Sequence, residues 1–140
     1  MQWLRVAKLL WALPCSLVGL ILATLPLALG GSAKVVSGAL EVTYRQHLAS
    51  CGKLALRLPF RGIVFGHVIL VVTQEELSRI GPHERVHVEQ YERWGPAFFV
   101  AYPASSLWQL MRGRHPYWYN HFEVQARLRS AEPLRPSGGV

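Results

Sequence analysis

The stretch "PHERVHVEQYERWGP", residues 82–96, contains two histidines, His83 and His87, with Glu84 between them. Side chains four residues apart lie on one face of a helix, so both imidazoles can point at a single metal ion. Glu84 would then lie beside the ion, where it can accept a proton from a water molecule. The alternative is two surface histidines that are one helical turn apart by coincidence. If the stretch is helical, the pattern predicts metal-assisted hydrolysis.

A zinc site with two histidines needs a third protein ligand, and the downstream candidates are His115, His121 and Glu123. Glu123 lies in "NHFEVQA", residues 120–126, which is typical of a helix start with Asn120 as the N-cap. A carboxylate in the first turn of a helix is well held for metal ligation. Without the two-histidine pattern it would be interpreted as a solvated helix residue. With that pattern, we favour Glu123 as the third ligand.

Together, "HERVHVEQYERWGP" and "NHFEVQA" resemble the motifs of small membrane-associated zinc metallopeptidases of the zincin superfamily, of the gluzincin type. The resemblance implies a Zn²⁺ ion held by His83, His87 and Glu123. It also implies Glu84 as the general base and a peptide or protein as the substrate. A strand within residues 66–72 would be an edge strand that pairs with the extended peptide.

The chain departs from those peptidases at Arg127, where an acidic residue is usual four positions after the glutamate ligand. It also has no evident oxyanion stabiliser. The candidates for that role are Tyr117, Tyr119 and His115. Their simpler role, which we favour, is packing or anchoring at a membrane interface. Metal binding without peptidase activity therefore stays open.

Two helices are expected around the pentad of residues 83–87. Thr73 begins "TQEE", a capping-box pattern that predicts a helix over residues 74–80, ended by Gly81. Pro82 suits the first turn of a second helix, which should run to Arg93. The pentad then lies in the first two turns of that helix, as the metal hypothesis requires.

The segment ahead of the helices alternates apolar and polar residues over 39–48 and 53–60, which predicts two half-buried strands. The β-branched run 62–72 predicts one buried strand with a bulge or bend at Gly66. His67, within that run, is interpreted as a core or strand-edge residue rather than a ligand. We therefore expect an α+β fold, a minimal zincin-like domain of short antiparallel strands followed by helices.

The first part of the chain is apolar. From Leu9 to Gly31 it carries no charge, and Arg5 and Lys8 precede it, which favours a membrane-spanning helix with its N-terminus in the cytoplasm. A cleaved signal peptide is the competing interpretation. The expected organisation is an anchor or signal over residues 1–31, a metal-binding domain over 32–130 and a disordered tail over 131–140. A bacterial inner membrane with the domain outside the cytoplasm fits this arrangement.

A second apolar stretch, residues 97–111, lies between the two proposed ligand segments. If it crossed the bilayer, Glu123 would lie on the opposite side from His83 and one ion could not bind both. We therefore expect a core helix, or an interfacial or re-entrant segment, bent at Pro103.

The amino-acid composition limits the classes of partner that the chain is expected to bind. The 140 residues include 15 Lys and Arg against 8 acidic residues, for a net charge of +7. Because the basic residues are scattered and form no nucleic-acid motif, an anionic membrane surface is favoured over nucleic acid. Cys15 and Cys51 are expected to be free thiols. Nothing in the sequence predicts an oligomeric state.

Two hypotheses follow from these patterns. The first is a membrane-anchored zinc-dependent hydrolase, a peptidase with a His-His-Glu site and Glu84 as general base. The second is a non-catalytic membrane interaction protein with a structural or vestigial metal site. Replacing Glu84 distinguishes them, because catalysis requires it and metal-dependent folding does not.

Overall fold

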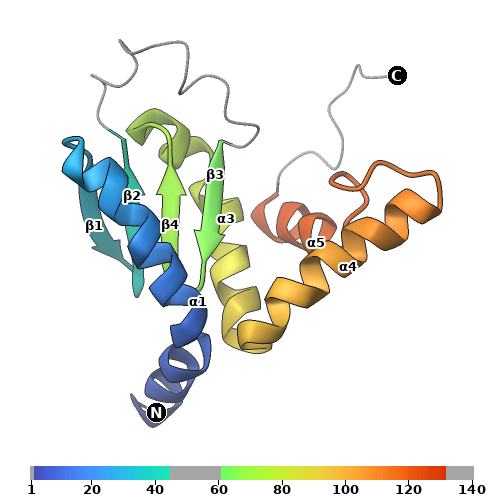
Figure 1. The fold of residues 1–140 in the computed structure, drawn as a ribbon, viewed down its shortest axis with the longest axis horizontal. Coiled ribbons are helices and arrows are strands. Elements are labelled where there is room, and N and C mark those ends of the chain that lie inside the picture. Colours follow the sequence, from blue (N-terminus) through green and yellow to red (C-terminus); the bar gives the residue numbers. More distant parts are fainter. Residues whose placement is uncertain (1, 45–60, 132–140) are drawn as a thin grey trace.

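The computed structural model describes residues 2–44 and 61–131. A long helix, α1 (Gln2–Ala28), leads into a four-stranded sheet. Helices α3 (Gln74–Trp94), α4 (Phe98–Met111) and α5 (His121–Ser130) follow, with a short 3-10 turn at Gly95–Ala97. Figure 1 shows α1 across one face of the sheet and α3 against the other. The α+β prediction is confirmed.

The sheet is built from two hairpins. Strands β1 (Ser32–Val36) and β2 (Ala39–Thr43) pair antiparallel, as do β3 (Gly62–Phe65) and β4 (Val68–Val71). The hairpins join through a parallel pairing of β2 with β4, so the order is β1-β2-β4-β3. The sheet is therefore mixed, although only antiparallel pairing was expected.

The prediction of one strand over 62–72 was wrong, because the run divides at Gly66 into β3 and β4. Gly66 has a φ of 59°, and a Cβ there would collide with Ser16 of α1. Only glycine allows both that backbone conformation and that close approach. The predicted edge strand within 66–72 was also wrong: β4 lies between β2 and β3, and among the described residues the edge strands are β1 and β3.

Two strand predictions upstream had different outcomes. Of the strand predicted over 39–48, residues 39–43 form β2. The strand predicted over 53–60 lies outside the described residues. Strand β1, with the sequence "SAKVV", was not predicted.

Helix α3 is one helix of 21 residues, so the predicted end at Gly81 was wrong. It begins as expected, with the Thr73 hydroxyl accepting a hydrogen bond from the Glu76 N–H at 3.1 Å. Pro82 lies inside the helix, where it removes one hydrogen bond at a cost of about 3 kcal/mol. Apolar residues on both sides of it, Leu77 and Val88, pack into the same core, and this burial offsets the cost.

One core unites the helices and the sheet. It contains residues of α1, β2, β3, β4, α3, α4 and α5, namely Ala12, Cys15, Ala39, Val64, Ile69, Val71, Leu77, Val88, Tyr91, Phe98 and Phe122. Cys15 is a free thiol, as expected, and Cys51 lies outside the described residues. Through this core, α5 is held beside α3 although the two are distant in sequence.

The apolar helix α1 presents small residues to the protein. Its buried positions are Ala12, Cys15, Ser16, Gly19, Ala23 and Pro26. Its length and composition would allow it to cross a membrane, and within the described ranges no second helix meets that test. A signal sequence can have the same properties.

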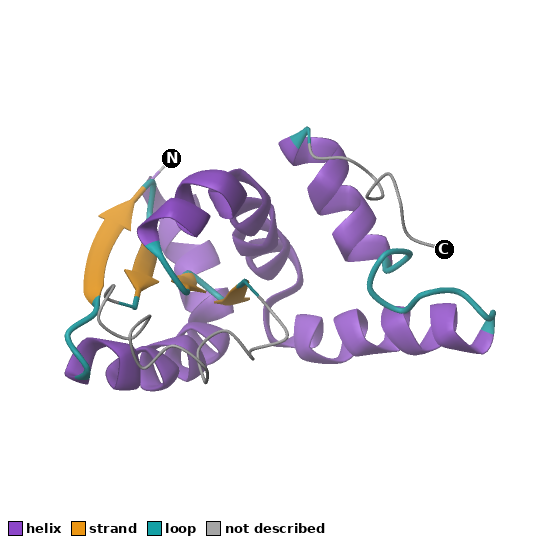
Figure 2. Cartoon of the chain, turned by 90° about the horizontal axis from the view of Figure 1, so that it is seen from above, coloured by secondary structure: helices purple, strands orange, loops and turns teal. Residues whose placement is uncertain are grey.

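Helix α4 differs from the expected core helix. Only Phe98 is buried in it, while Val100 is 71% and Met111 66% exposed. The helix continues through Pro103. The core-helix interpretation of 97–111 was therefore wrong, and an apolar surface is left uncovered. Figure 2 shows α4 and the C-terminal part of α1 along the same side of the molecule.

Candidate metal centre

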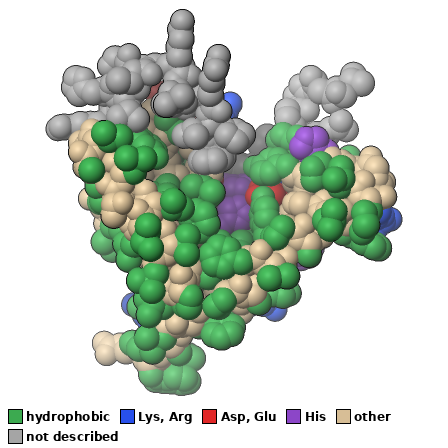
Figure 3. Space-filling view, viewed as in Figure 1, with side chains coloured by type: hydrophobic (Ala, Val, Ile, Leu, Met, Phe, Trp, Pro, Cys, Tyr) green, Lys and Arg blue, Asp and Glu red, His purple; other side chains and the backbone are tan. Residues whose placement is uncertain are grey.

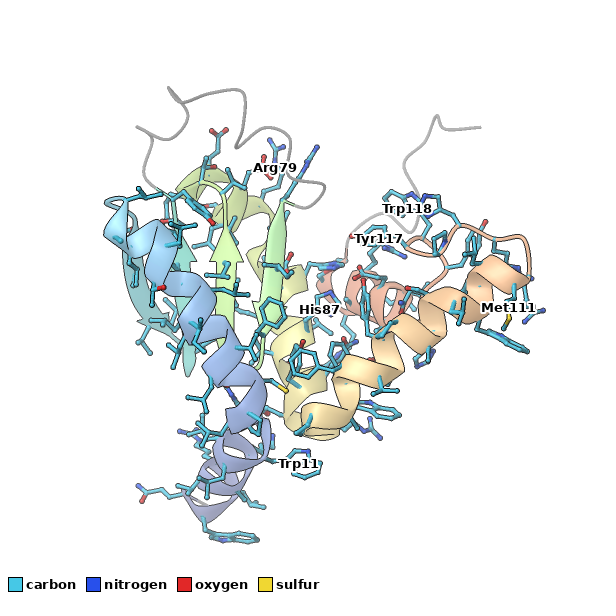
Figure 4. All side chains as sticks on the ribbon, in the orientation of Figure 1. Trp11, Arg79, His87, Met111, Tyr117 and Trp118 are labelled. Carbon is cyan, nitrogen blue, oxygen red and sulfur yellow. The ribbon has the colours of Figure 1, made fainter. Side chains whose placement is uncertain are left out.

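The structure brings three predicted residues together. His83 and His87 of α3 and Glu123 of α5 are buried, and their ligand atoms all lie within 4.8 Å of one another. The Nε2 atoms of the histidines are 3.1 Å apart. Glu123 Oε2 lies 3.1 Å from His83 Nε2, and Oε1 lies 3.3 Å from His87 Nε2. Figure 4 shows His87 in the space between α3 and the helices α4 and α5.

These separations fit a common ion. Ligand atoms about 2.0–2.1 Å from a tetrahedral zinc ion are about 3.3 Å from one another. The two Nε2 atoms are 3.1 Å apart, and each has a different Glu123 oxygen beside it, Oε2 at 3.1 Å from His83 and Oε1 at 3.3 Å from His87, so the separations are close to that value. With one ligand atom taken from each residue, all three lie within 4.8 Å of one another. The donor set of two imidazoles and one carboxylate, which leaves a fourth position for water, is typical of catalytic zinc.

Gln90 determines which His87 nitrogen faces the centre. The Gln90 amide group donates to the Phe122 carbonyl at 3.0 Å and to Gln125 Oε1 at 2.8 Å. Its own Oε1 therefore faces His87 Nδ1, at 2.8 Å, and accepts a hydrogen bond from it. With the proton on Nδ1, the Nε2 lone pair of His87 is directed into the centre, as a metal ligand requires.

Helix α5 is positioned by Asn120, which is fully buried. Its Oδ1 accepts a hydrogen bond from the Phe122 N–H at 2.9 Å, the predicted N-cap. Its Nδ2 donates to the Tyr102 carbonyl at 3.0 Å and to Ser106 Oγ at 2.7 Å. One side chain thus caps α5 and attaches it to α4, with Glu123 in the first turn.

Glu123 is held as a carboxylate. Burial by itself raises its pKa, but hydrogen bonds from His83, His87 and Tyr102 outweigh that effect and hold the pKa well below its usual range. The Tyr102 hydroxyl donates to Glu123 Oε1 at 2.6 Å. Burial and the charge of Glu123 raise the pKa of Tyr102, so the phenol keeps its proton and remains a donor. Both effects favour metal ligation.

Arg127, the departure from the zincin pattern, lies against this carboxylate. Its side chain is buried, with Nη1 3.7 Å from Glu123 Oε2. Nη2 donates to the Trp118 carbonyl at 2.5 Å, and the guanidinium lies 5.0 Å from the centre of the Trp118 ring. Figure 4 shows Trp118 beside Tyr117 in the segment before α5. Arg127 therefore places a positive charge beside the Glu123 carboxylate.

Glu84 is buried on the side of α3 that faces strand β3. A Cβ on Gly62, in β3, would lie 2.8 Å from Glu84 Oε1. The absence of a side chain at Gly62 thus makes room for the carboxylate. Glu84 therefore lies next to the edge strand β3, and its role as general base stays a prediction.

The three candidates for oxyanion stabilisation have different surroundings. His115 Nδ1 accepts hydrogen bonds from the backbone N–H groups of Tyr117 and Trp118, at 3.2 and 3.3 Å, and so closes a turn. Tyr119 is 41% exposed and lies 5.8 Å from the Arg114 guanidinium. Tyr117 is 43% exposed, and burial of its hydroxyl together with the charge of Glu123 raises its pKa, so its hydroxyl lies within range of that charge.

Two other histidines have structural partners. His67 donates its backbone N–H to Ser16 Oγ at 3.0 Å, and its Nε2 lies 3.2 Å from Glu92 Oε1. It belongs to the β3–β4 turn, in agreement with the structural interpretation. His121, a rejected ligand candidate, is exposed and packs on the Phe122 ring.

Gln90 and Tyr102 were missed by the sequence reasoning. Gln90 could have been found, because it follows His87 by three residues on the same helix face. Tyr102 lies in an apolar stretch with no motif around it. Its role depends only on where α4 is placed relative to α5.

Comparison with protein-family models, with curated proteins and with solved structures finds no match for this chain. The functional assignment therefore depends on the geometry of the centre.

Proposed function

We propose that the protein is a membrane-bound zinc-dependent hydrolase that cleaves peptides, with His83, His87 and Glu123 as zinc ligands. The observation that carries the proposal is the buried group of three donors at separations suited to one tetrahedral ion. Two observations support it: Glu123 is ionised, and the contact of His87 Nδ1 with Gln90 Oε1 leaves Nε2 as the nitrogen that faces the centre.

The residues around the centre have distinct roles in this proposal. A bound zinc ion would act as a Lewis acid on the substrate carbonyl and lower the pKa of a water molecule. Glu84 accepts the proton of the attacking water and passes it to the leaving amine. Tyr117, whose raised pKa keeps its phenol protonated, is the proposed donor to the carbonyl oxygen.

The substrate-binding element in this proposal is β3. An edge strand has unpaired backbone N–H and C=O groups, which can pair with an extended peptide. Because Gly62 of β3 lies against Glu84, a peptide paired to this edge would pass close to the general base.

The second candidate is a non-catalytic membrane protein with a structural metal. It is favoured by the environment of Glu123, whose oxygens already contact Tyr102 and Arg127 as well as the histidines. A carboxylate held this firmly could serve folding alone. The two candidates differ in what they require of Glu84.

The first prediction concerns metal content, measured by elemental analysis of the detergent-purified chain. We expect about one zinc per chain in the intact protein and in Glu84→Gln. His87→Ala and Glu123→Ala should contain none, because each removes a ligand. His121→Ala is the matched control, since it removes an exposed histidine beside Glu123 and should keep its zinc.

Peptide hydrolysis is measured on the same preparations. Glu84→Gln should lose it while keeping the metal. No zinc in the intact protein after reloading would rule out the hydrolase and a structural metal, and would leave a non-catalytic membrane interaction protein with a vestigial site. Zinc without any hydrolysis would leave the structural role. Loss of zinc in Glu84→Gln would mean that the roles of the acidic residues are misassigned.

A further inference from the structure

We infer that the protein binds one leaflet of a bilayer through α1 and α4, does not cross the membrane, and retains α1 in the mature chain. The inference rests on the proposed membrane association and not on the metal chemistry. It concerns the surface left exposed by the packing of α1.

Most of α1 lies against the rest of the protein. Trp11 lies against Gly95, Ser16 Oγ accepts a hydrogen bond from the His67 N–H at 3.0 Å, and a Cβ on Gly19 would be 2.7 Å from Val68 Cβ. Pro26 contacts Gly31 near the end of the helix. From residue 11 to residue 26 the helix is about 22 Å long, at about 1.5 Å per residue. A hydrocarbon core is about 30 Å thick.

If α1 crossed the bilayer, the sheet would therefore lie at the same depth. Strand β1 is an edge strand, and its Lys34 is exposed. Arg85, which pairs with Glu41 at 2.7 Å, is itself 45% exposed. Hydrocarbon satisfies neither the free backbone groups of an edge strand nor these charges. A perpendicular span is thus incompatible with the packing of α1.

The part of α1 that extends beyond the packed region is too short to cross alone. Residues 2–10 form about 14 Å of helix. They also include Arg5 and Lys8, and the Lys8 ammonium binds Glu92 of α3 at 2.8 Å. The N-terminus of the helix is thereby attached to the domain.

The outward side of α1 is nevertheless strongly apolar. Its inward positions are small residues, whereas Leu10, Ile21 and Leu25 are 63%, 69% and 61% exposed. Such a surface fits the apolar region of a bilayer and not water.

Helix α4 supplies a second apolar surface. Val100, Leu107, Trp108 and Met111 are 71%, 57%, 54% and 66% exposed and recur at helical spacing. Arg112 and Arg114 follow the helix, and the chain carries a net charge of +7, which suits anionic headgroups. Tryptophan and arginine at the end of an apolar stripe are typical of a membrane interface.

The two apolar surfaces flank the metal centre. Figure 3 shows apolar side chains on both sides of a hollow in which histidine and acidic side chains are visible. The same face carries α4 and the C-terminal part of α1 (Figure 2). Docked in this way, the hollow opens toward the leaflet, and its substrates would be peptide segments held at the bilayer surface.

Retention of α1 follows from the core. Ala12 and Cys15 are fully buried in the main core, and Ala23 packs with Val42, Val68 and Leu70 in a second cluster. Removing the segment as a signal peptide would expose both clusters to water. The mature protein therefore keeps the helix.

The test is the topology of the full chain in bacterial membranes, with an epitope tag at each end. We expect both tags in the mature protein, in the membrane fraction, and cleaved by an impermeant protease from the same side. Tags accessible from opposite sides would show a span, and loss of the N-terminal tag would show signal cleavage. Either result would overturn the inference, as would recovery of the protein in the soluble fraction.

The apolar surface is tested with vesicles of phosphatidylcholine and phosphatidylglycerol. Leu107→Glu should bind them about tenfold more weakly, because it inserts a charge into the α4 stripe. Leu128→Glu, at an exposed leucine of α5, is the control and should bind as the intact chain does. Equal binding of all three proteins would exclude α4 from the docking surface. His87→Ala should bind the vesicles normally, so failure of the zinc proposal is distinguishable from failure of this one.

Discussion

Gln90 decides the tautomer of His87, and with it the direction of a lone pair in the centre. Its amide is held by two acceptors on α5, so it cannot turn over without losing both hydrogen bonds. Interactions of this kind with a ligating histidine raise its basicity and fix its ring. The metal affinity of the centre should therefore depend on a residue that does not touch the ion.

Replacing Gln90 tests that dependence. Gln90→Leu should weaken zinc binding by about 10- to 100-fold, because His87 loses its orienting acceptor. Competition with a chelator of known affinity measures the change. Gln74→Leu, at an exposed position at the start of the same helix, should bind zinc as the intact chain does. Unchanged affinity in Gln90→Leu would mean that helix α3 alone orients the ring.

The pair of His87 and Glu123 makes the stability of the metal-free protein depend on pH. Burial lowers the pKa of His87, but the hydrogen bond and charge of Glu123, with the charge of Glu84, outweigh it and raise that pKa above 6.5. Its stabilising contribution is thus present below about pH 6.5 and is lost as the pH rises through the raised value. Glu123 has a lowered pKa, so its contribution is present above about pH 4.5 and is lost as the pH falls.

The free energy of unfolding without metal should therefore be greatest between about pH 4.5 and 6.5 and decline on both sides. With zinc bound, the decline above pH 6.5 should disappear, because zinc binds the neutral imidazole. Denaturant titrations with chelator and with zinc measure both curves. His87→Ala should lack the decline above pH 6.5, and a decline that persists in this variant would have to come from another group.

At the scale of elements, the centre lies where α3, α4 and α5 meet the edge of the sheet. Asn120 connects two of these helices, because it caps α5 and donates two hydrogen bonds to α4. The edge strand β3 approaches α3 through Gly62, where a side chain would meet Glu84 and Ile80. The position of Glu84, the proposed general base, therefore depends on a glycine in the strand.

Gly62→Ala should disturb Glu84 and not the zinc ligands. Its Cβ would lie 2.8 Å from both Glu84 Oε1 and Ile80 Cδ1, so the carboxylate must move. We expect peptide hydrolysis to fall by up to about a hundredfold, since misplacement of a catalytic group by about 1 Å can cost that much, while zinc content stays unchanged. Gly81→Ala is the control, because a Cβ there meets only Leu77 Cδ1 at 3.9 Å. Full activity in Gly62→Ala would exclude Glu84 as a closely positioned base.

At the scale of the whole molecule, the inner and outer surfaces of α1 differ in the size of their side chains. Its inner side needs small residues to approach the sheet, and its outer side is covered by large apolar ones. Gly19 of α1 lies against Val68 and Phe65. A large apolar side chain at position 19 would therefore make α1 more hydrophobic but disrupt its packing on the sheet, so one substitution tests the two properties separately.

Gly19→Leu should destabilise the protein by about 1–3 kcal/mol, because an added side chain overpacks the contact with β4. The substitution also makes the helix more hydrophobic, so a detached membrane anchor would tolerate it. Thermal unfolding in detergent measures the effect, and Ile21→Leu, at a position 69% exposed, should leave the transition unchanged. Equal stability of the two variants would show that α1 does not pack on the sheet.

Local patterns in the sequence determined the α+β class, the apolar first helix, the Thr73 and Asn120 caps and the helical face shared by His83 and His87. These features depend on residues within a few positions of one another, where helical periodicity and capping hydrogen bonds act directly. The alternation of residues also predicted β2, and the position of Glu123 in a first turn followed from its cap.

The tertiary structure alone decided the rest, because long-range packing can outweigh a local preference. Core contacts on both sides of Pro82 keep α3 continuous past Gly81, and the approach of Ser16 turns the run of residues 62–72 into a hairpin. The same packing carries Glu123 to His83 across 40 positions of sequence. It also supplies the partner Tyr102, which no local pattern could place, because Glu123 lies 21 positions away in the chain.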